Sequence, residues 1–490
     1  MRTLVRRIAA ILLVPALLAG GAVLAQDRKT LTLAVTLEPP HLDPTAGAAA
    51  AIDEIVYANV FEGLTRIDET GAVKPQLATT WDVSADGKTY TFHLRPGARF
   101  HDGKLLESAH VVFSMLRAVA PDSANAQKGL FEPIESVEAK GLQTVVIRLK
   151  RPEGGFLFSL SWGDMVIVHP DTVATNKEKP VGTGPFKFAS WTRGDRVVLE
   201  KADARAKLDR VVFRFIADPQ AMVSELMAGS VDGTPNLNAP EAFAQFGKDA
   251  RFEAVAGTTE GETLLSINNA RKPFDSLLVR RALSHAIDRK ALVEAAMFGH
   301  GTPIGSHFAP HHPAYVDLTG TYTHDVAKAR ALLKQAGVEN LEVTIKLPPP
   351  PYARRGGEVI AAQLAEAGIR ANLVPVEWAQ WLEQVFKGGD FDLTIVSHTE
   401  PLDIGIYGRD KYYFAYNSDA FRALMTELAG TADQDKRYDI YRKAQRLLAE
   451  DTPAVFLFEL AKLGVWKKGV AGLWHNSPVQ ANDVTAAYWK

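Results

Sequence analysis

A candidate ligand-binding cluster follows the short buried strand that the apolar run Phe391–Val396 predicts. The cluster offers hydrogen-bonding and charged side chains and one aromatic ring, at His398, Thr399, Glu400, Asp403 and Tyr407. Imidazole, hydroxyl and carboxylate groups gathered in one loop suit the recognition of a small polar solute without covalent chemistry. The alternative interpretation is a capped loop whose acids face solvent.

A second candidate is the basic pair Arg354–Arg355, just before a helix expected at Glu358–Ala367. The planar guanidinium of arginine binds a carboxylate through two parallel hydrogen bonds. A helix N-terminus favours acids over bases, so helix stability does not explain the pair. A solvated basic pair is the alternative. Acidic and basic groups at opposite ends of a cleft suit a zwitterionic solute.

Aromatic side chains are the candidates for apolar walls around such a solute. They are Trp162, Trp378, Trp381 and Tyr407. Because Trp378 and Trp381 stand at the helical spacing i, i+3, we expect one of the two to be a core residue. Asn268, which follows the expected strand Leu264–Ile267, is a further polar candidate.

Four histidines lie within 13 residues, at positions 300, 307, 311 and 312. A metal or metal-chelate site built from His307, His311 and His312 is one interpretation. However, their spacing matches no pair of ligands on one helix face, and no carboxylate stands close to them in sequence. A Pro/Gly loop carrying polar side chains is therefore favoured, and we expect no resident metal and no cofactor.

Enzyme motifs are absent from the sequence. It contains neither G-x-S-x-G nor H-E-x-x-H, and it has no cysteine for thiolate chemistry or disulfides. Gly182 and Gly184 resemble a phosphate loop only superficially, because the lysine–serine pair is missing. We expect a strand-entry turn that requires positive φ there. The sequence therefore predicts a protein that is not an enzyme.

The N-terminal residues 1–25 are typical of a cleaved signal peptide, with Arg2, Arg6 and Arg7 before an apolar run and Val23–Ala25 at the cleavage site. No cysteine is available there for a lipid anchor, and no other stretch is apolar over about 18 residues. The expected location is the periplasm. Removal of the peptide lowers Lys+Arg from 55 to 52 against 57 Asp+Glu, a net charge of −5, which argues against nucleic-acid binding.

The pattern of elements predicts an α/β protein of at least two lobes, because about 465 residues exceed what one core accommodates. Residues 88–94 alternate, with Tyr90, Phe92 and Leu94 on one face of a strand. Ser108 is the expected cap of the helix that follows. A single long amphipathic helix is expected at Leu277–Phe298.

Five separated stretches resemble the extracellular solute-binding proteins of the peptide/nickel/opine class, family 5. They are Lys74–Arg117, Pro180–Phe188, Asn269–Lys290, Asp325–Gly337 and Gln363–Asp392. They stand in the family's order and span most of the chain. The resemblance implies a two-lobe periplasmic-binding-protein fold (type II, cluster C), with an extra subdomain on lobe I and a hinge between the lobes. It also implies ligand capture by closure and delivery to an inner-membrane ABC permease by a monomeric protein without a membrane anchor.

By analogy with the family, lobe I holds residues 26–60, 180–265 and 466–490, the extra subdomain holds 61–179, and lobe II holds 266–465. Dipeptide-binding members carry a Gly-Trp and then an aspartate for the ligand's ammonium group where this chain has Ser397-His398. Glu400 or Asp403 takes that role here, with Asp403 preferred, and Arg354–Arg355 resembles the position of their carboxylate-binding arginine.

The resemblance favours a dipeptide, an opine or a modified amino acid as the solute. A metal-chelate or oligosaccharide binder of the same family is the alternative, since nickel capture occurs in the family. An exported hydrolase and a peptide-holding chaperone are rivals from other classes.

Overall fold

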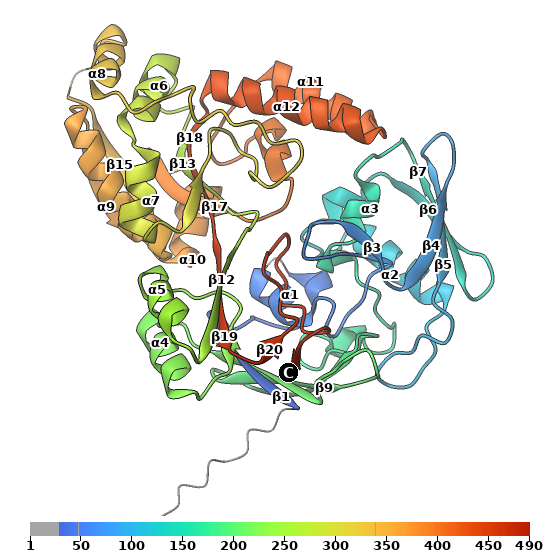
Figure 1. The fold of residues 1–490 in the computed structure, drawn as a ribbon. Helices are drawn as coiled ribbons and strands as arrows, with labels where there is room; N and C mark the ends of the chain where they lie inside the picture. Colours follow the sequence, from blue (N-terminus) through green and yellow to red (C-terminus); the bar gives the residue numbers. More distant parts are fainter. Residues whose placement is uncertain (1–28, 48, 339) are drawn as a thin grey trace, which may run out of the picture.

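Two lobes and a smaller subdomain make up the computed structural model, which describes residues 29–47, 49–338 and 340–490 (Figure 1). The predicted signal peptide lies outside the described residues. We call the part around the seven-stranded sheet lobe I, the part around the six-stranded sheet lobe II, and the part around the four-stranded sheet the subdomain. No helix in these described ranges is long and apolar enough to cross a membrane.

The sheet of lobe I is mixed, since β1 runs parallel to β10 and β11 while the other pairs are antiparallel. Its strands, in spatial order, are β12 (Phe252–Gly257), β19 (Lys462–Lys467), β11 (Gly233–Thr234), β1 (Thr30–Val35), β10 (Arg210–Phe215), β9 (Arg196–Lys201) and β8 (Phe186–Thr192). The helices α1 (Ala50–Val56), α4 (Pro219–Ala228) and α5 (Pro240–Lys248) belong to this lobe. A C-terminal pair, β20 (Val470–Ala471) and β21 (Tyr488–Trp489), lies beside it.

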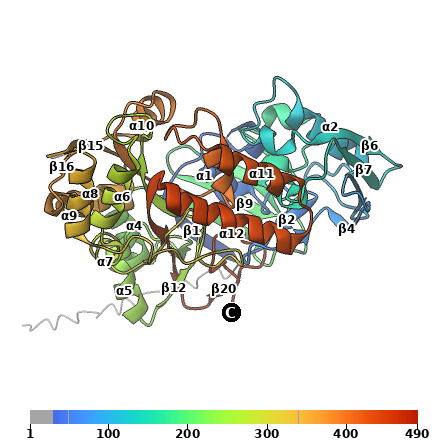
Figure 2. The ribbon, with the colours of Figure 1, turned by 90° about the horizontal axis from the view of Figure 1, so that it is seen from above.

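The sheet of lobe II is also mixed, with β15 parallel to β16 and β17. Its strands, in spatial order, are β14 (Gly301–Pro303), β18 (Ala454–Leu460), β13 (Glu262–Ile267), β17 (Leu393–His398), β15 (Glu342–Leu347) and β16 (Arg370–Pro375). The helices of the lobe are α6 (Leu277–Ala286), α7 (Arg289–Met297), α8 (Val326–Gln335), α9 (Pro351–Glu366), α10 (Trp378–Trp381), α11 (Asp419–Gly430) and α12 (Gln434–Asp451). Figure 2 shows α11 and α12 extending from lobe II toward the subdomain.

The subdomain is built on an antiparallel sheet, β4 (Ala78–Val83), β5 (Thr89–Leu94), β7 (Thr144–Leu149) and β6 (Ile134–Ala139), with the helices α2 (Ser108–Val119) and α3 (Phe156–Ser159) and the hairpin β2 (Thr65–Ile67) and β3 (Val73–Pro75). The predicted alternation of Tyr90, Phe92 and Leu94 is confirmed, because these three side chains are buried while their neighbours in β5 are partly exposed. They form part of the subdomain's core.

The chain passes between lobe I and lobe II twice, at residues 258–261 and at Ala461. These crossing segments are bonded to each other: Thr259 Oγ1 donates to the carbonyl oxygen of Leu460 at 2.7 Å, and Leu460 N donates to Gly261 O at 2.8 Å. The predicted boundaries at 265/266 and 465/466 differ from this topology, since each falls inside a strand. The other boundaries stay predictions.

The predictions for the cap of α2 and for the helix Leu277–Phe298 are wrong. Glu107, not Ser108, is the N-cap of α2, in a capping box with His110, while Ser108 Oγ donates to Gly141 O. The expected helix Leu277–Phe298 is two helices, because Asp288 stops the first and caps α7 with its side chain. Short polar residues cap helices by accepting from free N–H groups of the first turn, and this competes with continuing a helix through them.

The Gly/Pro turn before β8 needs its glycines for a reason other than positive φ, which neither Gly182 nor Gly184 adopts. An added Cβ would lie 2.0 Å from Val60 O at Gly182 and 2.3 Å from Asn59 O at Gly184. Gly184 N donates to Val60 O at 2.9 Å, and Phe186 N donates to Asn59 O at 2.9 Å. The glycines thus allow two backbone segments to touch.

We predict that Gly184→Ala destabilises the protein by about 1–3 kcal/mol, because the new methyl group must displace backbone rather than a side chain. Guanidinium unfolding followed by circular dichroism measures the change. Gly129→Ala is the matched control, since its added Cβ meets nothing within 4 Å. Equal stability of Gly184→Ala and the wild type would contradict this account of the turn.

Candidate ligand-binding site

Asp403 stands at the centre of a buried hydrogen-bonded chain in lobe II, at the start of the 3₁₀ helix Asp403–Gly408. His307 Nε2 donates to its Oδ1, and His398 Nδ1 lies 3.2 Å from its Oδ2. An ionised carboxylate only accepts, so both rings donate. Burial by itself raises the pKa of Asp403, but the charges and hydrogen bonds of the two histidines outweigh burial and hold that pKa well below its usual range.

The far nitrogens of both rings are also engaged. The hydroxyl of Tyr407 lies 3.4 Å from His307 Nδ1, and the hydroxyl of Tyr413 lies 3.1 Å from His398 Nε2. Ser266 Oγ is hydrogen-bonded to the Tyr413 hydroxyl at 2.8 Å. Tyr407 belongs to the aromatic core of lobe II, rather than to an exposed wall. These contacts place the predicted residues His398, Asp403 and Tyr407 in one buried network.

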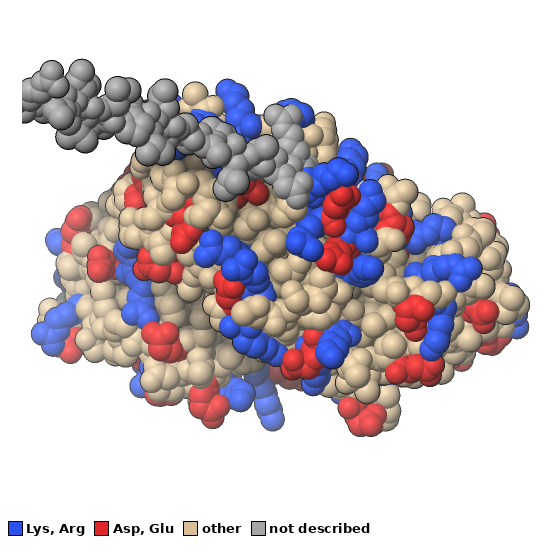
Figure 3. Space-filling model, turned by 90° about the horizontal axis from the view of Figure 1, so that it is seen from below, with Lys and Arg blue, Asp and Glu red and all other residues tan. Residues whose placement is uncertain are grey.

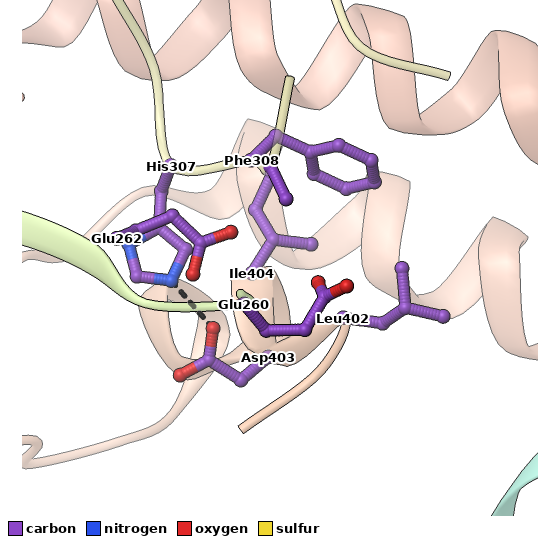
Figure 4. A pocket seen from close by; sticks show the side chains of 8 residues that line it. Glu260, Glu262, His307, Phe308, Leu402, Asp403 and Ile404 are labelled. Carbon is purple, nitrogen blue, oxygen red and sulfur yellow. Dashed lines mark hydrogen bonds and ion pairs between the residues drawn. The ribbon is translucent and has the colours of Figure 1, made fainter. Parts of the chain in front are cut away.

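A small recess opens beside this network, next to the crossing segments (Figure 4). It is lined by Glu260, Glu262, His307, Phe308, Ala309, Leu402, Asp403 and Ile404. Glu262, the first residue of β13, is 4% exposed, and its Oε2 has no hydrogen-bond partner. Burial first, and then the negative charges of Asp403 and Glu260, raise the pKa of Glu262 well above its usual value.

His311 joins the two crossing segments. Its Nε2 lies 2.8 Å from Glu260, in the first segment, and its Nδ1 lies 3.2 Å from Glu459, near the end of β18. Burial alone would lower the pKa of His311, but hydrogen bonds and charges from Glu260 and Glu459 raise it to about 10. The ring is therefore an imidazolium at neutral pH, and both of its N–H groups are used.

The three histidines considered for a metal have separate partners. His307 faces Asp403, His311 faces two glutamates, and His312 Nδ1 accepts from Ala314 N at 3.0 Å. Burial and the neighbouring His311 lower the pKa of His312 to about 4. Contrary to the expectation from sequence spacing, carboxylates do lie near these rings, because distant segments supply them.

Both arginines of the predicted basic pair are hydrogen-bonded to other groups of the protein. Arg354 donates from Nε to Pro348 O and from Nη2 to Val376 O, each at 3.0 Å. Arg355 donates to both carboxylate oxygens of Glu241 in α5, at 2.9 and 3.1 Å. Both arginines lie in α9, which begins at Pro351 rather than at Glu358. Arg355 thus links lobe II to lobe I, and its role toward a solute stays a prediction.

The remaining predicted residues lie apart from the recess lining. Asn268 Nδ2 donates to Gly389 O at 2.9 Å and to Phe391 O at 3.2 Å, which fixes a turn. Trp381 is buried and Trp378 is 37% exposed, so one of this pair is a core residue, as expected. Trp162 is buried in a separate cluster, where its Nε1 has no partner.

The loop after β17 reaches lobe I. Gln480, in the C-terminal segment, donates to Thr399 O at 3.0 Å and to Thr399 Oγ1 at 3.1 Å. The carboxylate of Glu400 accepts from the neighbouring Thr399 N at 3.2 Å. This loop therefore contacts both lobes.

Sequence reasoning missed Glu260, Glu262 and Glu459. A signal was present, because Glu260 and Glu262 immediately precede an apolar strand, and Glu459 interrupts the apolar run Ala454–Leu460. An acid in a buried strand is costly unless it is paired or functional, and such positions deserve inspection.

Comparison with known proteins is consistent with this architecture. The dipeptide-binding protein of Escherichia coli K12 is 29% identical over 455 residues, covering 82% of this chain and 84% of that protein. The structure of the periplasmic binding protein AgaA from A. tumefaciens R10, in complex with agropinic acid, matches with a TM-score of 0.82 and 27% identity, over 94% of this chain and 99% of that one. The periplasmic binding protein DppA of Helicobacter pylori, in complex with the peptide STSA, matches with a TM-score of 0.83 and 26% identity, over 94% and 98% of the two chains.

These matches confirm the predicted two-lobe periplasmic-binding-protein fold of cluster C. The family model described as bacterial extracellular solute-binding proteins, family 5 Middle, matches residues 72–419, more than half of the chain. The chain therefore belongs to family 5 of the bacterial extracellular solute-binding proteins, which bind solutes and are not enzymes.

Proposed function

We propose that this protein is the periplasmic subunit of an ABC importer and captures a small amine–carboxylate solute, such as a dipeptide, an opine or a modified amino acid. It closes its lobes on the solute and delivers it to an inner-membrane permease, acting as a monomer. The observation that carries this proposal is the acid-lined recess beside the crossing segments. The dipeptide, the agropinic acid and the peptide named with its relatives support the solute class.

The recess presents the carboxyl groups of Glu260, Glu262 and Asp403 and the imidazole of His307. A carboxylate-rich site favours a cation, such as an ammonium group. The recess is far smaller than the pockets that enclose a whole drug-sized ligand, which span about 300–1,000 Å³. A solute therefore has at most one of its ends there.

The recess is also narrow, since no gap in it is as wide as a water molecule. Its lining residues all come from lobe II and the first crossing segment, so a solute group enters only when these side chains move apart. The mixed charges in Figure 3 show no continuous basic stripe on the face seen from below, so that face favours no polyanionic partner.

Lobe closure brings lobe II against both lobe I and the subdomain. Gln480 meets Thr399 between the lobes. On the subdomain side, a Cβ added to Gly154 would lie 2.1 Å from Thr431 O, between α11 and α12, and 2.5 Å from Arg437 Nη1. Backbone thus touches backbone at the outer contact, as expected for a closed form.

We predict that a free dipeptide, an opine or a modified amino acid raises the melting temperature of the ligand-free protein. A solute at a hundredfold excess over its Kd adds about 2.7 kcal/mol to the free energy of unfolding. Thermal-shift screening, with mass spectrometry of any co-purified solute, measures this. Stabilisation by oligosaccharides or metal chelates alone would refute the proposed solute class.

We predict that Gly154→Ala weakens solute binding by about 5- to 150-fold, because the new methyl group opposes closure at a cost of about 1–3 kcal/mol. The melting temperature without solute should not change, since the methyl group is free when the lobes are apart. Titration calorimetry and small-angle scattering measure both effects. The control Gly320→Ala adds a Cβ with nothing within 4 Å. Unchanged affinity in Gly154→Ala would show that this contact is not part of closure.

Metal-chelate capture is the second candidate, favoured by one observation. Potential ligand atoms of Glu262, His307 and Asp403 lie within 4.8 Å of one another. Against it, both ring nitrogens of His307 are already hydrogen-bonded, so a metal would have to displace one of those bonds.

We predict that Ni²⁺ or Zn²⁺ added to the chelator-treated protein shows no saturable one-to-one binding that depends on His307. Calorimetric titration of the wild type and of His307→Gln tests this, with His312→Gln as the control histidine. One equivalent of metal, bound by the wild type and His312→Gln but lost in His307→Gln, would establish the metal site instead.

A further inference from the structure

We propose that Glu262, rather than Asp403, binds the cationic group of the solute, and that its carboxyl group releases a proton when it does so. This inference rests on the proposed function, because it requires a solute that carries an amine. It assigns the amine subsite to the hinge end of β13, a position outside the predicted loop 397–417.

The carboxyl groups of Asp403 and Glu262 differ in how many of their oxygens already have hydrogen-bond partners. Both oxygens of Asp403 face histidine nitrogens, His307 on one side and His398 on the other. Glu262 Oε2 has no partner, although it is buried and the residue lines the recess. A buried carboxylate oxygen without a partner costs free energy that an incoming N–H donor recovers. Glu262 is therefore the group whose bonding a solute completes.

The backbone fixes Glu262 firmly. In the sheet it stands opposite His398 of β17 on one side and Glu459 of β18 on the other. It is also the first residue after the crossing segment 258–261. Its side chain is therefore placed by two flanking strands rather than by a loop, and a contact made there lies beside the hinge.

The charges around Glu262 oppose its ionisation in the free protein. The titratable groups that face it from the crossing segment, the two neighbouring strands, the loop after β14 and the 3₁₀ helix are Glu260, Glu459, His398, His307, His311, Asp403 and Tyr407. The positively charged His311 is already ion-paired with Glu260 and Glu459. Burial and the neighbouring carboxylates raise the pKa of Glu262, which agrees with a protonated carboxyl in the free protein.

Solute affinity should depend on pH through the carboxyl group of Glu262. A bound ammonium group favours the ionised carboxylate and lowers its pKa, so binding expels the proton. Affinity should therefore increase as pH rises toward the free-state pKa of Glu262 and level off above it. A solute without a cation, such as an N-acetylated dipeptide, lacks the charge that replaces the proton.

Calorimetry in buffers of different ionisation enthalpy tests the proposal, using a panel of free dipeptides and the same dipeptides N-acetylated. The wild type should release a proton on binding a free dipeptide and should bind the acetylated form weakly. Glu262→Gln should bind about 10- to 100-fold more weakly, without proton release. Its unliganded melting temperature should not fall, because the amide keeps the shape and removes a buried acid.

Two variants serve as controls. Glu358→Gln, on an exposed position of α9, should behave as the wild type. Asp403→Asn, which disturbs the bonds of His307 and His398, should lower the melting temperature but retain proton release. If Asp403→Asn loses proton release and Glu262→Gln keeps it, Asp403 rather than Glu262 binds the amine.

The inference fails if a dipeptide binds the wild type without proton release, or if Glu262→Gln keeps both full affinity and proton release. Equal affinity for free and acetylated dipeptides would likewise overturn it. In each case binding itself would still support the proposed function. If no dipeptide, opine or modified amino acid binds the wild type, the proposed function fails as well.

Discussion

The bonded pair of crossing segments is the constraint on which the rest of this structure depends. Only residues 258–261 and Ala461 carry the described chain between lobe I and lobe II. The hydrogen bonds between Thr259 or Gly261 and Leu460 make the two segments move together. Because β12 and β19 continue into one sheet and β13 and β18 into the other, a small rotation of the segments is transmitted to two rigid bodies.

Buried ionisable side chains are concentrated at the crossing segments. Glu260, Glu262 and Glu459 lie on or beside the crossing segments, and the imidazolium of His311 contacts Glu260 and Glu459. The buried Asp403 is matched by its own two histidines. A buried charge is tolerated only with a partner, which agrees with the raised pKa of Glu262, whose Oε2 has no partner. The proposed amine subsite therefore lies at the hinge.

Much of the fold was predictable, because its signals are local. The alternation in β5 and the family-like stretches depend on neighbours in sequence. The site was less predictable, because its partners are distant: His311 meets Glu260 and Glu459, 51 and 148 residues away. Spacing arguments found His398 and Asp403 but could not show that each already had a partner in the fold.

A group bound beside the axis of a hinge has almost no lever arm. Glu262 follows the crossing segment directly, so a cation held there exerts little turning force on either lobe. The leverage for closure would then come from the parts of the solute that lie farther from the hinge. A bare amine would then occupy the subsite and leave the lobes apart, acting as a competitor that is held but not imported.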